Sequence, residues 1–163
     1  MPMAALLKSK LEFTRHITNL LITAFPEDQR LHQPYDGANH LLWQVGHLGV
    51  SAQGLAGMID PSHPKPDPSL DKLFGVKSAP MADASAYPDY AEVHTYFDQA
   101  MADLIALIAD KDDAWFEQKV GEEQAMFGPT FAGVVMTVCW HEGLHAGQIT
   151  TLRKSLGLDL VLA

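Results

Sequence analysis

Apolar residues recur at spacings of three and four along most of this chain, and this spacing is typical of helices that bury one face. Alternating patterns that would indicate strands are almost absent. The periodicity predicts a short helix around 112–118 and four long helices over about 3–25, 39–59, 89–109 and 129–156. The sequence therefore predicts an all-α fold, a four-helix bundle in which the whole chain, 1–163, forms one domain.

One connection between these helices is unusually long. Residues 61–88 hold six of the ten prolines in the chain. A connection of this length inside a compact domain is uncommon and often forms a crossover or a lid. We therefore expect a bundle with long crossover connections rather than tight hairpins.

The charge balance and the cysteine content limit the partners and the compartment. The chain has 20 acidic and 11 basic residues, a net charge of −9, and no run of lysine or arginine. Proteins that read nucleic acids usually carry a basic face, so we expect no nucleic-acid partner and no anionic membrane surface. Only one cysteine is present, and we find no signal peptide and no apolar run long enough to span a membrane. A cytoplasmic protein is expected.

Two of the eight histidines have a spacing that suits a shared metal ion. His141 and His145 are four residues apart, which places both imidazoles on one face of the last predicted helix. Two side chains so placed can reach one ion at about 2.0–2.1 Å each. The same face carries apolar residues, so the pair is expected to point inward. The alternative is a pair of core histidines satisfied by hydrogen bonds.

The segment from His141 to His145 also fits the HExxH pattern of zinc proteases, with Glu142 as the general base. That interpretation is disfavoured because only eighteen residues follow His145, and Asp159 is the only acidic one among them. Thr151 stands where the extended motif has a third histidine. A third ligand must come from elsewhere in the chain. His47, on the second predicted helix, is the best candidate, although a lone histidine there is more often structural.

Two segments together resemble the DinB/YfiT-like family of metal-binding proteins. They are Asn39-x-x-x-Trp43-x-x-Gly46-His47-Leu48 and His141-Glu142-x-x-His145-x-Gly147-Gln148-Ile149. The resemblance implies a four-helix bundle with overhand connections, usually as a homodimer. It implies His47, His141 and His145 as the ligands of a divalent ion, zinc or nickel first. Some proteins of this family are transferases or isomerases that use a low-molecular-weight thiol.

Three neutral histidines leave a coordination position open, as in catalytic rather than structural zinc sites. An ion there could lower the pKa of a bound water or thiol. The expected function is therefore a thiol-dependent S-transferase or a hydrolase acting on a small-molecule substrate. The alternative is a non-catalytic metal-binding bundle, in which His40 or Glu142 supplies a fourth ligand. A ferritin-like carboxylate site is disfavoured, because it needs two Glu-x-x-His motifs and the chain has one.

Four further residues are candidates for the pocket around the ion: Glu142, Gln148, His16 and His40. Glu142 is turned about 100° from His141 around the helix, so we expect it to orient a ligand or to face another helix. Gln148 could hydrogen-bond a ligand, or be a buried amide. His16 forms an i,i+4 pair with Glu12 that could line the pocket or be solvated. His40 lies seven residues before His47, on nearly the same face.

The second predicted helix is rich in small residues, namely Gly46, Gly49, Ala52, Gly54 and Gly57. They allow either close packing against a neighbouring helix or room for a ligand. Trp43 and Trp140 are expected in the core, and Cys139 on the side of its helix opposite His141.

Overall fold

The computed structural model describes residues 1–161, which contain α-helices, three short 3-10 helices and one isolated β-bridge, between Lys119 and Thr130. The α-helices are α1 (Met3–Thr23), α2 (Leu41–Ile59), α3 (Pro68–Phe74), α4 (Tyr90–Ile108), α5 (Asp113–Phe116) and α6 (Phe131–Ser155). The all-α prediction is confirmed. Within 1–161, no helix is long and apolar enough to cross a membrane.

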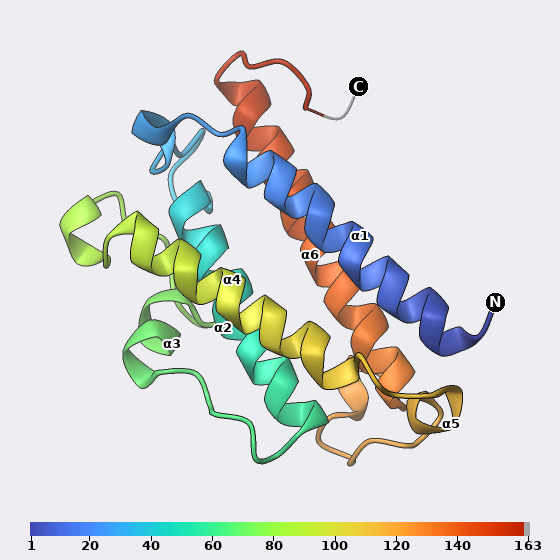
Figure 1. Cartoon of the computed structure of the whole chain (residues 1–163). Coiled ribbons are helices and arrows are strands. Elements are labelled where there is room, and N and C mark those ends of the chain that lie inside the picture. Colours follow the sequence, from blue (N-terminus) through green and yellow to red (C-terminus); the bar gives the residue numbers. More distant parts are fainter. Residues whose placement is uncertain (162–163) are drawn as a thin grey trace.

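The four long helices lie side by side in two directions (Figure 1). Helices α1 and α6 run in one direction, and α2 and α4 run in the other. Neighbouring helices that run in the same direction need a connection that returns along their length. The segment between α2 and α4, which contains α3, makes this return, so the proline-rich stretch 61–88 is the expected crossover.

Helix α2 is the most enclosed element of the fold, with 14 of its 19 residues buried. A Cβ at Gly46 would overlap the ring of Phe74, and one at Gly49 would lie 2.9 Å from Tyr96. These two glycines therefore permit close packing. A Cβ at Gly54 or Gly57 would meet nothing within 4 Å. Close packing is thus the role that the structure shows for Gly46 and Gly49, whereas Gly54 and Gly57 border open space.

The two helices that matter most for the site begin slightly later than predicted. His40 caps α2, because its Nδ1 accepts the backbone N–H of Trp43 at 3.1 Å. Thr130 caps α6, so that helix starts beyond Pro129. A histidine cap is hard to anticipate, because serine, threonine, asparagine and aspartate are the usual cap residues.

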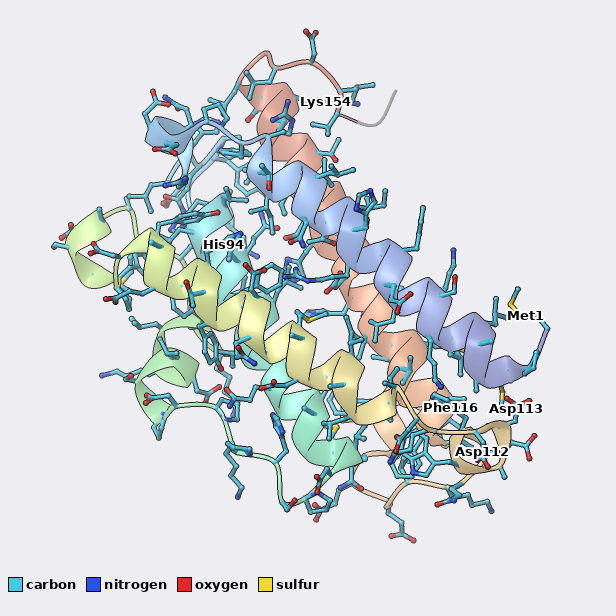
Figure 2. The ribbon with its side chains drawn as sticks, viewed as in Figure 1. Met1, His94, Asp112, Asp113, Phe116 and Lys154 are labelled. Atoms are coloured by element: carbon cyan, nitrogen blue, oxygen red, sulfur yellow. The ribbon has the colours of Figure 1, made fainter. Side chains whose placement is uncertain are left out.

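Helix α5 anchors the N-terminal end of α1. The carboxylate of Asp113 accepts the backbone N–H groups of Met3 and Ala4, at 3.1 and 2.7 Å. Figure 2 shows Met1 and Asp113 together at this end, with Lys154 at the far end. The first four backbone N–H groups of a helix lack partners within that helix, and Asp113 accepts two of those of α1, from Met3 and Ala4.

The prediction for the two tryptophans is half right. Trp43 is buried, but Trp140 is 65% exposed. Val138 and Glu142 are buried, and each is two residues from Trp140 along α6. Positions two apart lie on nearly opposite sides of a helix, so Trp140 faces outward. Cys139 is partly buried.

Candidate metal centre

Helices α2 and α6 bring His47, His141 and His145 together. One nitrogen from each imidazole lies within 4.8 Å of the other two. The Nε2 atoms of His47 and His141 are 3.2 Å apart. Within residues 1–161, this is the one group of three or more histidine, cysteine or acidic side chains that is close enough to hold a metal ion.

The spacing of these nitrogens suits a shared ion. Two nitrogens that are each 2.0–2.1 Å from a tetrahedral ion lie about 3.3 Å apart. The separation of 3.2 Å between His47 and His141 is close to this value. Two neutral imidazoles that pointed their lone pairs at each other without an ion or a proton between them would repel. The three residues therefore fit a divalent ion.

Hydrogen bonds from Nδ1 turn the Nε2 lone pairs of two rings toward the cluster. His47 Nδ1–H donates to the carbonyl oxygen of Phe74 at 2.7 Å, and His145 Nδ1–H donates to Gln44 Oε1 at 3.2 Å. The Gln44 amide is held in turn, because its Nε2 donates to the Asn39 carbonyl at 2.8 Å. Such partners fix the tautomer and the orientation of histidine ligands.

Burial keeps the three histidines neutral. It lowers the pKa of His47, and it lowers the pKa of His141 to about 4, with a further contribution from the nearby His47. The pKa of His145 falls to about 3 through burial and through its two histidine neighbours. Neutral imidazole is the form that binds metal ions, so the cluster is ready to bind at neutral pH.

Sequence reasoning missed the groups that hold these rings. Gln44 lies three residues before His47, one turn away on the same helix, and this spacing is the signal that could have found it. The Phe74 carbonyl carries no side-chain signal. Trp43 also went unrecognised as part of the site, although its ring stacks on His47 with 4.7 Å between the ring centroids.

Glu142 points away from the cluster and faces α1. It is buried, and Thr18 Oγ1 donates to its Oε2 at 3.1 Å, while no group of residues 1–161 bonds to its Oε1. Burial raises the pKa of Glu142 to about 7, although the nearby Arg15 acts in the opposite direction. Of the two roles expected for Glu142, facing another helix is the one that the structure shows. Its direction also does not fit the general base of an HExxH protease.

The other three pocket candidates are not brought to the cluster. His40 is buried, with Nδ1 accepting from Trp43 and Nε2 donating to the Met81 carbonyl at 3.0 Å. His16 is exposed on α1. Gln148 is partly buried and lines a separate groove, together with the loop that precedes α2.

A cavity of about 520 Å³ adjoins the cluster between α2 and α6, and His141 forms part of its wall. His141 is partly exposed, whereas His47 and His145 are buried. The cluster can therefore be reached from this cavity.

Comparison with known families gives one result that covers these residues. The sequence profile of the DinB superfamily matches residues 10–149, a span that includes all three histidines. No curated protein matches the chain.

Proposed function

This chain belongs to the DinB superfamily, and from that premise we propose that it is a divalent-metal-dependent enzyme acting on a small molecule. His47, His141 and His145 would hold the ion through their Nε2 atoms. The observation that carries the proposal is a cluster of three neutral histidines beside a cavity, with neither His40 nor Glu142 in place as a fourth ligand. Three ligands and an open position are the pattern of catalytic rather than structural zinc sites.

A bound ion would lower the pKa of a water or thiol and so supply a nucleophile near neutral pH. The protein's own residues prepare the site for it. Gln44 and the Phe74 carbonyl fix two rings, and Trp43 covers one face of His47. His141 borders the cavity, so a substrate would approach the ion from that side.

Zinc or nickel is the proposed ion. The proposed reaction is the transfer of a thiol to a small electrophile, with a low-molecular-weight thiol as co-substrate, or the hydrolysis of a small molecule. The net charge of −9 supports a small-molecule partner rather than a nucleic acid, and a single cysteine supports a cytoplasmic location.

A second candidate function is a non-catalytic metal site that ties α2 to α6. It is favoured by the placement of the ligands, one on α2 and two on α6, so that a bound ion would join the two helices. The two functions differ in the fourth coordination position. An ion that accepts an added thiol as a ligand supports the enzyme, and an ion that accepts none supports the structural role.

Metal content tests the shared premise of both functions. The protein should be purified without a nickel column and examined by elemental mass spectrometry, beside a His141→Ala variant. We expect about one divalent ion per chain, lost in this variant. His16→Ala is the matched control, because His16 is exposed and outside the cluster. A chain without metal that gains no thermal stability from added zinc or nickel would contradict the proposal.

A further inference from the structure

The cavity beside His141 extends well beyond the metal ligands. It runs along α2 from Val50 to Met58 and is bordered across from α2 by residues of α6. At 1.5 Å per residue, this part of α2 spans about 12 Å. The volume of about 520 Å³ is typical of pockets for small molecules. The cavity can therefore hold more than the group that would contact the ion.

The walls of this cavity are mainly apolar. Its side chains include Val50, Leu55 and Met58 from α2, and Phe127 and Trp140 from the opposite side. Thr137 also lines it, but the threonine hydroxyl donates to the Phe127 carbonyl and is already satisfied. Binding of an apolar ligand is favourable here, because it removes the apolar surfaces of the ligand and of the cavity wall from water.

Away from the proposed ion, the described residues give the cavity no cation that could pair with a charged substrate. No lysine or arginine is among its lining residues, and its one acidic residue is Asp71, which is exposed. A carboxylate or phosphate at the distal end of a ligand would lose water without gaining an ion pair. Asp71 would also repel it.

We propose that the cavity selects substrates with an uncharged, apolar tail joined to a single group that binds metal, such as a thiol. The head would lie at His141, and the tail would extend between α2 and α6 toward Met58. This inference rests on the proposed function, because the ion would hold the head. The same cavity disfavours thiols that carry additional carboxylates.

Gly54 offers a way to fill the cavity without disturbing the fold. It lines the cavity, and a Cβ added there meets nothing within 4 Å. A leucine at this position would occupy the space of the proposed tail. Gly57→Leu is the matched control, because Gly57 is on the same helix and also has open space, but does not line the cavity.

The test measures how thiol affinity depends on the tail. Cobalt-loaded protein is titrated with ethanethiol, butanethiol and hexanethiol, and binding is followed by the thiolate-to-cobalt absorption band. We expect affinity to rise roughly two- to fourfold for each added methylene. Mercaptohexanoate, which adds a carboxylate to the far end of the tail, should bind at least about tenfold more weakly than hexanethiol. Gly54→Leu should lower the affinity for hexanethiol about tenfold and leave that for ethanethiol unchanged, while Gly57→Leu should change neither.

A second measurement needs no metal. Nile red, an uncharged apolar dye, should bind the metal-free protein, be displaced by hexanol, and bind Gly54→Leu more weakly than Gly57→Leu. If the chain binds no cobalt but the dye behaves as expected, the proposed function fails and the apolar cavity stands. Affinity that is independent of tail length, or tighter binding of mercaptohexanoate, would overturn the inference. Equal dye binding by the two variants would overturn it as well.

Discussion

The three histidines are alike in chemistry but differ in how firmly they are held. His47 and His145 each donate Nδ1–H to a fixed oxygen, whereas His141 Nδ1 has no hydrogen-bond partner among residues 1–161. His141 is also the partly exposed member that borders the cavity. Two of the proposed ligands are thus held in place by hydrogen bonds, whereas the ring of the third, His141, is not fixed in this way.

Gln44 should contribute to metal affinity although it lies behind His145 and would not contact the proposed ion. Replacing it by leucine, of similar size, removes the acceptor for His145 Nδ1–H. Loss of such a partner typically weakens metal binding about 10–100-fold. Competition with a chelator of known affinity measures this change. Gln148→Leu is the control, because Gln148 lies outside the cluster, and an equal loss in both variants would contradict the assigned role of Gln44.

The stability of the metal-free protein should carry a pH dependence that comes from Glu142. Burial raises the folded-state pKa of Glu142 to about 7, above its ordinary value of 4.5. Below about 4.5 both states are protonated, and as pH rises through 7 the folded state loses its advantage in binding the proton. The stability that the protonated Glu142 contributes is therefore lost as the pH rises from about 4.5 through 7, so the fold is less stable at pH 8.5 than at pH 5.

Glu142→Gln removes this titration and should gain stability, relative to the unmodified protein, on going from pH 5 to pH 8.5. The expected gain is about 2 kcal/mol. Urea unfolding of the metal-free proteins at the two pH values measures it. All other groups are shared by the two chains, so their titrations cancel in the comparison. A stability difference that is the same at both pH values would show that Glu142 does not titrate in this range.

The side chains of the site could be predicted from sequence better than their supports. His141 and His145 stand out by their spacing, and His47 by a motif on a second helix. Gln44 is a common residue at an ordinary position, and the Phe74 carbonyl belongs to the backbone, so neither has a distinctive pattern. His40 and His16 show a second limit of the sequence. Their positions on suitable helices made them candidates for the pocket, but position alone does not show whether a histidine ring binds a ligand, caps a helix or faces solvent.

At the scale of elements, the short helix α3 lies within the crossover segment and contacts the histidine cluster through its last residue. It ends at Phe74, and the last carbonyls of a helix have no donors within that helix. His47 supplies one, so the same hydrogen bond completes the end of α3 and orients a proposed ligand. Gly46 makes this approach possible, because any side chain there would overlap the Phe74 ring.

Gly46→Ala should therefore weaken both the fold and the site. The overlap would push α3 from α2, with an expected cost of about 1–3 kcal/mol in unfolding free energy. Metal affinity should fall as well, because Phe74 would no longer hold His47. Gly57→Ala is the control, and it should gain about 0.5–1 kcal/mol from improved helix propensity with unchanged metal affinity. Denaturant unfolding and chelator competition measure the two effects, and a Gly46→Ala chain that keeps full affinity would show that Phe74 is dispensable.

The long helices were predicted within a few residues because each repeats its apolar positions over several turns. The short helix α3 was not, since seven residues give too little periodicity among the prolines of 61–88. Trp140 was assigned to the core because large aromatic residues are usually buried. The buried face of α6 includes the charged residue Glu142 as well as the apolar Val138, so hydrophobicity alone does not identify that face.

At the scale of the whole molecule, two rows of apolar side chains remain uncovered on α1 and α6, which lie next to each other (Figure 1). On α1 they are Leu6, Phe13 and Leu20, and on α6 they are Met136, Trp140 and Leu144. Residues seven apart, or four apart, share a face of a helix, so each row follows one line along its helix. Exposed apolar surface often marks interaction sites in proteins when it gathers on one face.

We propose that this surface joins two copies of the chain as a homodimer. Size-exclusion chromatography with light scattering should give about twice the chain mass of 17.9 kDa. Phe13→Lys and Met136→Lys should each shift the protein toward the monomer, because a dimer interface would bury the new charges without partners. Leu160→Lys, which replaces an exposed apolar residue outside both rows, should leave the dimer intact.

Neither Phe13 nor Met136 touches the histidine cluster, so metal content should stay unchanged in all three variants. A monomeric wild-type protein, or lysine variants that remain dimeric, would show that these rows are not the interface.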